Sequence, residues 1–122
     1  MKKILIVDDQ LEIRELVEIS LRDKGYHILQ AENGIEAIEI AKEEKPDLAI
    51  MDILMPGEID GLEATRMIKS DPLTKDIKII IFTVKGQNAD REKGFEVGAE
   101  EYLVKPFRSF ELIKIVEKVL GE

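Results

Sequence analysis

The stretch KILIVDD, residues 3–9, decides the fold class of this chain. Four consecutive apolar residues, 4–7, are followed at once by two carboxylates, Asp8 and Asp9. A strand with one face in water alternates apolar and polar residues, whereas a continuously apolar strand is buried on both faces. Residues 79–82, Ile-Ile-Ile-Phe, have the same continuous pattern. Such strands are typical of parallel sheets that helices cover on both sides.

Outward from this stretch, short apolar runs alternate with segments of helical periodicity along the whole chain. The expected strands are residues 4–7, 27–31, 48–51, 77–82 and 101–104. The first expected helix ends at Lys24-Gly25 and has an apolar face made by Ile13, Leu16, Val17, Ser20 and Leu21; the others are residues 35–44, 62–70, 88–97 and 110–120. The segment 88–97 is polar and contains Gly94, so we expect it to be the least stable helix. The alternation predicts an α/β fold and a single domain over residues 1–122.

The composition narrows the classes of function. The 122 residues include no Cys and one His, which excludes disulfides, thiolate metal sites and sites with several His ligands. A net charge of −8 disfavours a nucleic-acid-binding surface, because such a surface needs clustered Lys and Arg. No apolar run approaches the ~20 residues of a membrane span, and the one after Lys3 is shorter than the ~7–15 residues of a signal-peptide core. We therefore expect a soluble, cytoplasmic protein that binds neither nucleic acid nor membrane.

Charged and hydroxyl side chains stand where the predicted strands end. Asp8 and Asp9 follow the first strand, Asp52 the third, Thr83 the fourth and Lys105 the fifth. In an open parallel sheet the ligand site lies beyond the carboxyl ends of the strands, so these side chains are expected to meet at one edge. Two carboxylates about 4 Å apart repel by ~1 kcal/mol in water and by ~4 kcal/mol at an effective dielectric constant of about 20. Three carboxylates need counter-charge, which Lys105 and a divalent cation such as Mg²⁺ would supply.

Each of these residues also has an ordinary structural explanation. An Asp pair after a strand often caps the next helix, and a single Asp often forms a turn. Thr is a common strand residue, and an isolated Lys is usually a solvated charge. His27 begins the second strand, away from this edge, and is interpreted as structural or solvent-facing. Only the combination at one edge favours a functional site.

Several short motifs occur in a specific order and spacing. They are ILIVDD at 4–9, DLAIMD at 47–52, Met55-Pro56, Asp60-Gly61, IFT at 81–83, Gly98-Ala99 and YLVKPF at 102–107. In this combination the chain from Lys3 to Leu120 resembles a response-regulator receiver domain of the chemotaxis-regulator type, the phosphoacceptor of two-component signalling. The resemblance implies a flavodoxin-like, three-layer α/β/α sandwich whose five-stranded parallel sheet has the order 2-1-3-4-5.

The resemblance also implies a role for each polar residue at the edge. Asp52 would accept a phosphoryl group from a phosphohistidine on a sensor histidine kinase or a phosphotransfer protein. Lys105 would contact a phosphoryl oxygen, Thr83 would donate a hydrogen bond to the phosphoryl group, and the Lys105–Pro106 bond would be cis. The implied ligands of Mg²⁺ are Asp8, Asp9, Asp52 and the backbone carbonyl of Leu54. These roles agree with the needs of phosphoryl transfer, which are in-line positioning and neutralisation of the phosphoryl oxygens.

Two further sets of residues acquire roles from the resemblance. Thr83 and Tyr102 would form a switch: Thr83 drawn to the phosphoryl group would vacate space for the Tyr102 ring and alter the surface of residues 88–120. Ile13, Pro106 and Phe107 would dock the partner that donates the phosphoryl group. The alternative for Tyr102, Ile13 and Phe107 is ordinary core packing.

The residues that flank the acceptor predict a long-lived phosphorylated state. Val84 is bulkier than the Ala or Gly usual in the family, and Leu54 cannot orient a water molecule by hydrogen bonding. Lys85 would screen the phosphoryl charge or point to solvent. We therefore expect slow self-dephosphorylation; the alternative is that Leu54 and Val84 only pack the edge.

The chain departs from the family pattern in two places. Residues 57–59 contain one extra residue, so we expect the loop to bulge near Gly57 without loss of the metal site. Arg108 stands where the family often has a helix-capping Asp, Ser or Thr, and Ser109 is expected to cap one residue later.

These observations predict a stand-alone phosphorylatable switch that signals by protein contact and lacks an output domain. A receiver excised from a longer chain is the alternative, and the expected state is a monomer or a weak homodimer. A metal-dependent phosphatase is less favoured, because Leu54 stands where its general acid would be. No Gly-x-Gly-x-x-Gly follows the first strand, which disfavours dinucleotide binding, and the full set of site residues disfavours a purely scaffolding receiver. We expect no enzyme activity beyond the chain's own phosphoryl transfer and dephosphorylation.

Overall fold

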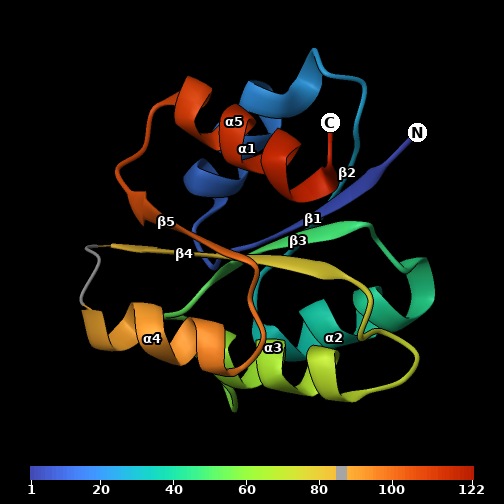
Figure 1. The fold of residues 1–122 in the computed structure, drawn as a ribbon, viewed down its shortest axis with the longest axis vertical. Helices are drawn as coiled ribbons and strands as arrows, with labels where there is room; N and C mark the ends of the chain where they lie inside the picture. Colours follow the sequence, from blue (N-terminus) through green and yellow to red (C-terminus); the bar gives the residue numbers. More distant parts are fainter. Residues whose placement is uncertain (85–87) are drawn as a thin grey trace.

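The computed structural model describes residues 1–84 and 88–122. Its sheet has five parallel strands in the order β2-β1-β3-β4-β5, so the predicted fold class is confirmed. Helices and strands alternate along the described chain (Figure 1). Their bounds are β1 Lys3–Val7, α1 Leu11–Arg22, β2 His27–Ala31, α2 Gly34–Glu44, β3 Leu48–Asp52, α3 Gly61–Ser70, β4 Lys78–Val84, α4 Asn88–Glu96, β5 Glu101–Lys105 and α5 Ser109–Leu120.

Helices cover both faces of the sheet (Figure 1). Helices α1 and α5 lie on one face, and α2, α3 and α4 lie on the other. In β1, Ile4 and Ile6 pack towards α1 and α5, whereas Leu5 and Val7 pack towards α2 and α3. All four side chains are fully buried, as expected for a continuously apolar strand between two helical layers.

The α1–α5 face contains a polar residue that the sequence pattern missed. We predicted Leu16 on the buried side of α1, but Leu16 is 45% exposed and Arg14 is buried with Val17 and Leu21. Residues 14, 17 and 21 share one helical face. The position of Arg14 three residues before Val17 was the sequence signal that it is buried. We overlooked this signal because the apolar residues nearby already gave the helix a buried face.

The start of α5 differs from the prediction. The helix begins at Ser109 with Arg108 as its N-cap residue, so the expectation that Ser109 would cap the helix was wrong. The carboxylate of Glu111 accepts a hydrogen bond from the backbone N–H of Arg108 at 2.9 Å. The Ser109 hydroxyl instead hydrogen-bonds the Ser20 hydroxyl at 2.9 Å, which joins α5 to α1.

Gly57 lies on the solvent side of the loop between β3 and α3. Gly57 has a φ of 114°, and nothing lies within 4 Å of the place where a Cβ would stand. Ile59 turns back and packs beside Gly34 at the start of α2. The Asp60 side chain then caps α3 by accepting from the backbone N–H of Glu63 at 2.9 Å.

Gly61 sits where two backbone segments meet. Its N–H donates to the carbonyl of Ile53 at 2.9 Å, and a Cβ on Gly61 would lie 1.9 Å from the carbonyl oxygen of Asp52. Any side chain at this position would push α3 away from the end of β3.

Among the described residues, no helix has the length and apolar character that a membrane crossing requires.

Candidate functional site

The register of the sheet places the acidic residues side by side. Val7 pairs with Met51 and Asp52 pairs with Phe82, so Asp8 follows β1 directly beside Asp52. Carboxylate oxygens of Asp8, Asp9 and Asp52 lie within 4.8 Å of one another. Asp8 is 0% exposed and Asp52 is 4% exposed, whereas Asp9 faces solvent. The structure thus brings the three predicted carboxylates together at the carboxyl edge of the sheet.

Four contacts hold Asp8 in place. Its backbone N–H donates to the Ala31 carbonyl at 3.1 Å, and its own carbonyl accepts from the Arg14 guanidinium at 2.7 Å. Of its carboxylate oxygens, Oδ1 accepts from the backbone N–H of Gln10 at 2.8 Å and Oδ2 accepts from Lys105 Nζ at 2.7 Å. Asp8 therefore stays buried without an unsatisfied polar atom.

Arg14 links this contact to the neighbouring strand. Its Nε donates to Gln30 Oε1 at 2.9 Å, and its guanidinium lies 3.8 Å from the exposed carboxylate of Glu32. The side chain is 8% exposed. A buried guanidinium of this kind needs such partners, because an unpaired buried charge is costly.

Lys105 is the positive charge of the site. Its Nζ lies 2.7 Å from Asp8 Oδ2 and 3.5 Å from Asp52 Oδ2, and its side chain is 10% exposed. The ammonium also lies 4.5 Å from the centroid of the Phe82 ring. The peptide bond between Lys105 and Pro106 is cis.

The surroundings of Asp52 raise its pKa to about 6. Burial is the main cause, because the charged form loses water. The Lys105 ammonium lowers the pKa, the Asp8 carboxylate raises it, and the backbone N–H of Leu54 lowers it slightly. The carboxylate is therefore mostly ionised at neutral pH.

The residues present fit a magnesium ion. Carboxylate oxygens and a nearby backbone carbonyl are hard ligands of the kind that Mg²⁺ prefers. Among the carboxylates of Asp8, Asp9 and Asp52, the Lys105 ammonium supplies one positive charge against three negative ones. A divalent cation would balance the remaining charge. The expected fourth ligand is the backbone carbonyl of Leu54, two residues after Asp52; the Leu54 side chain itself is 68% exposed.

Thr83 and Tyr102 lie on the opposite face of the sheet from Lys105. Thr83 is 1% exposed, and Tyr102 pairs with Ile81 in the register, so the two side chains are diagonal neighbours on the α4 side. Among the described residues, the buried Tyr102 hydroxyl has no hydrogen-bond partner. Burial raises the pKa of this hydroxyl, and the Asp90 carboxylate adds to the effect.

The predicted docking residues border the site. Ile13, Pro106 and Phe107 line an apolar hollow of about 260 Å³ together with Gln10, Leu16, Val84 and Lys105. Ile13 and Phe107 are half-buried and Pro106 is exposed. Lys105 is part of this lining, so the hollow adjoins the acidic edge next to the start of α1.

Of the residues predicted to tune the phosphoryl lifetime, two are described. Leu54 and Val84 are 68% and 60% exposed at the carboxyl edge of the sheet. Lys85 lies outside the described residues. His27, interpreted as structural or solvent-facing, is exposed at the start of β2.

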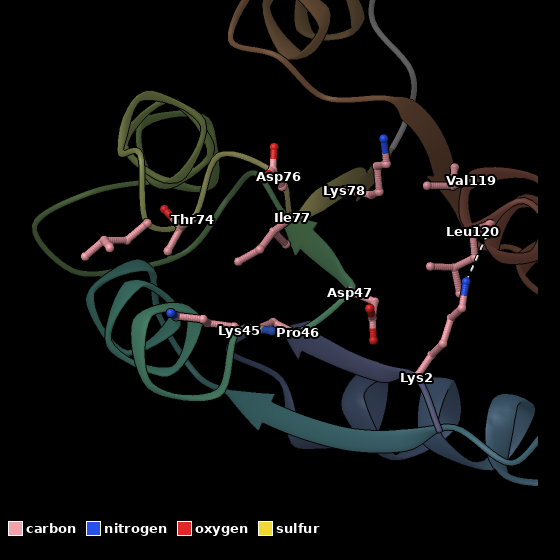
Figure 2. Close-up of a pocket in the computed structure, with 11 residues that line it drawn as sticks. Lys2, Lys45, Pro46, Asp47, Thr74, Asp76, Ile77, Lys78, Val119 and Leu120 are labelled. Carbon is pink, nitrogen blue, oxygen red and sulfur yellow. Dashed lines mark hydrogen bonds between the residues drawn. The ribbon is translucent and has the colours of Figure 1, made fainter.

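A larger hollow of about 370 Å³ lies at the opposite end of the sheet. Figure 2 shows its lining, which includes Lys2, Asp47, Thr74, Lys78 and Leu120. The Lys2 ammonium donates to the Leu120 carbonyl at 3.1 Å. The residues predicted from the sequence as functional all lie away from this hollow.

The strand order and the acidic edge define a flavodoxin-like α/β protein with a cluster of three carboxylates at the carboxyl ends of its strands. The chain also matches the family model of the response regulator receiver domain over residues 4–117. It therefore belongs to this family of two-component signalling proteins. Members of the family bind Mg²⁺ at an acidic pocket and interact with histidine kinases or phosphotransfer proteins.

Individual relatives resemble the chain to different extents. Protein PilH of Pseudomonas aeruginosa is 41% identical, with 99% of each chain covered. The phosphate regulon transcriptional regulatory protein PhoB of the same species is 44% identical over 98% of this chain and 52% of its own length. The chain thus spans about half the length of several curated relatives. A crystal structure of the receiver domain of sensor histidine kinase PA1611, with a magnesium ion in its active-site cleft, has a TM-score of 0.89 and 32% identity, covering 99% of this chain and 98% of that one.

Proposed function

We propose that the chain is a phosphoacceptor switch in which Asp52 takes a phosphoryl group from a phosphohistidine of a histidine kinase or phosphotransfer protein. The observation that supports this most strongly is the placement of Asp52. Its carboxylate lies beside those of Asp8 and Asp9 and 3.5 Å from the Lys105 ammonium. A buried carboxylate among cation ligands is suited to attack phosphorus and is poorly explained by fold stability alone.

The chemistry follows from these contacts. An oxygen of the ionised Asp52 carboxylate attacks phosphorus as the phosphorus–nitrogen bond of the phosphohistidine breaks, and the imidazole leaves. The Lys105 ammonium lies 2.7 Å from Asp8 and 3.5 Å from Asp52, which supports a role in neutralising a phosphoryl oxygen. Asp8, Asp9, Asp52 and the Leu54 carbonyl would hold Mg²⁺, which would neutralise further phosphoryl charge. Thr83 at the end of β4 would donate a hydrogen bond to the phosphoryl group.

The proposed output is a change in the surface of α4, β5 and α5. Thr83 and Tyr102 share one face of the sheet, so a shift of Thr83 towards the phosphoryl group changes the space beside the Tyr102 ring. The Tyr102 hydroxyl is buried without a hydrogen bond among the described residues, which is a costly state for a polar group. That cost favours a second position of the Tyr102 ring, in which its hydroxyl regains a partner. A downstream protein would recognise the surface that this second position creates.

The partner that donates the phosphoryl group would dock at the hollow of Ile13, Pro106 and Phe107. This hollow is apolar and opens beside Lys105, so a bound helix would lie next to the acceptor. An exposed apolar patch beside a charged site commonly marks an interface.

The direct test is incubation of the purified chain with acetyl phosphate, with Mg²⁺ in one arm and a chelator in the other. Intact-mass measurement is expected to show one added phosphoryl group only with Mg²⁺, and peptide mapping is expected to place it on Asp52. No mass gain, or a phosphoryl group on another residue, would contradict the proposal.

The exposed residues at the edge lead to a kinetic prediction. Val84 and Leu54 are expected to shield the phosphoryl group from water, so Val84→Ala and Leu54→Asn should each hydrolyse several-fold faster, which is about 1 kcal/mol in the barrier. The measurement is the decay of the phosphorylated chain after removal of the donor. Leu73→Ala is the control, because Leu73 is 63% exposed and lines the hollow at the other end of the sheet. Parental decay rates in both site variants would refute the steric argument.

A further inference from the structure

Phe82 is an apolar residue that lies between two charged residues of the site, Asp52 on β3 and Lys105 on β5. Asp52 pairs with Phe82, and Phe82 pairs with Leu103, which precedes Lys105 by two residues. Because side chains alternate along a strand, Asp52, Phe82 and Lys105 project from the same face of the sheet. Phe82 is fully buried, and its strand β4 lies between β3, which carries Asp52, and β5, which carries Lys105.

The ring contacts the lysine with its π face. Lys105 Nζ lies 4.5 Å from the ring centroid, within the range at which an ammonium is attracted by the ring quadrupole. The attraction is stronger where the cation has lost water, and the Lys105 side chain is 10% exposed. An aliphatic residue would fill the same core volume without this attraction.

A second aromatic residue orients the ring. The rings of Phe82 and Phe107 meet edge to face, with centroids 5.9 Å apart and an interplanar angle of 61°. This arrangement is the preferred one for an aromatic pair. It leaves a face of Phe82 turned to the Lys105 ammonium.

We propose that Phe82 is a positioning residue, whose ring holds the Lys105 ammonium between the carboxylates of Asp8 and Asp52 for phosphoryl transfer. The inference rests on the proposed phosphoacceptor function. The ammonium donates a hydrogen bond to Asp8 and faces Asp52, while the ring attracts it without occupying either carboxylate. The lysine is thereby held in place for an incoming phosphoryl oxygen.

The test weakens the π face while keeping the shape of the ring. Phenylalanine analogues with one to three ring fluorines are introduced at position 82, and the rate of phosphorylation by acetyl phosphate is measured. The rate is expected to fall progressively, by about threefold to tenfold with three fluorines, because ring fluorines withdraw charge from the face. The same analogues at Phe110, which is 62% exposed, are expected to leave the rate unchanged.

A second measurement does not depend on phosphorylation. The ring current of Phe82 is expected to shift the NMR signals of the Lys105 side chain, and Phe82→Leu should remove this shift. Ile80→Val is the packing control, since Ile80 is a fully buried neighbour in the same cluster. A Lys105 signal that Phe82→Leu leaves unchanged would overturn the inference.

The outcomes separate the inference from the proposed function. A parental chain that takes up no phosphoryl group on Asp52 refutes the proposed function, whatever the NMR result. A parental chain that is phosphorylated at a rate independent of fluorination refutes the role of the Phe82 ring alone.

Discussion

Replacement of Asp52 by Asn is expected to abolish phosphorylation and, at the same time, to make the folded chain more stable at neutral pH. The amide cannot attack phosphorus, so acetyl phosphate with Mg²⁺ should add no phosphoryl group to the variant. The gain in stability arises because the ionised carboxylate is buried at 4% exposure beside Asp8. Asn removes that charge with little change in shape.

The sign and the pH window follow from the pKa of Asp52. Folding raises this pKa from 3.8 to about 6, so between these values the folded chain retains a proton that the unfolded chain has lost. The contribution of Asp52 to the stability of the parent therefore falls as pH rises from about 4 to about 6. Asp52→Asn does not titrate there, so its advantage should grow over this window to about 1–3 kcal/mol and stay constant above it.

Urea unfolding at a series of pH values measures this difference. Asp76→Asn is the matched control, because Asp76 is exposed and lines the hollow at the other end of the sheet. It removes the same net charge from an exposed position, so its effect on stability should be small. Equal stability of the Asp52→Asn variant and the parent at pH 7 would show that burial of the ionised Asp52 carries no net cost.

The second large effect is expected from Gly61→Ala. A Cβ at Gly61 would lie 1.9 Å from the Asp52 carbonyl oxygen and 2.9 Å from Ile53 Cα, and both of these atoms belong to the backbone. Neither can rotate away as a side chain would, so the start of α3 must move. We expect a loss of about 3–4 kcal/mol in the free energy of unfolding.

The same displacement should weaken Mg²⁺ binding. Gly61 N–H holds the Ile53 carbonyl at 2.9 Å, immediately before Leu54, whose carbonyl is a proposed ligand. Calorimetric titration of Mg²⁺ should show an affinity at least about tenfold lower, a difference of ~1.4 kcal/mol.

Gly57→Ala is the control in the same loop. Nothing lies near its Cβ position, so only its φ of 114° opposes a side chain. The cost should be about 1–2 kcal/mol, with Mg²⁺ affinity unchanged. Equal effects of the two substitutions would contradict the argument from close approach at Gly61.

The fold could be predicted because β1, β3, β4 and β5 each contain two independent signals. Residues 79–82 are apolar throughout, which indicates burial on both faces, and polar residues mark where β1, β3, β4 and β5 end. The expected strands stopped one or two residues short of the observed ends of β3, β4 and β5, where Asp52 and Lys105 are the last strand residues and Thr83 is the last but one. The sequence alone does not distinguish a polar residue that ends a strand from a polar residue that begins the following loop.

The internal contacts of the site were harder to predict. The tighter contact of Lys105 is with Asp8 rather than Asp52, and it depends on side-chain rotamers that spacing does not determine. Arg14 was hidden among apolar residues of α1, and Phe82 was interpreted only as part of an apolar run. In both cases the residue serves the core and the site together.

The loop between β3 and α3 differs from the strands in how readily its length can change. Asp52, Thr83 and Lys105 each belong to a strand, so an insertion or deletion within β3, β4 or β5 would turn every later side chain of that strand to the wrong face. Gly57 instead lies in the loop with open space around its Cβ position. The helix α3 begins only after Asp60, whose side chain caps it. A change in length is therefore tolerated more readily in this loop than within β3, β4 or β5, where it would displace Asp52, Thr83 or Lys105.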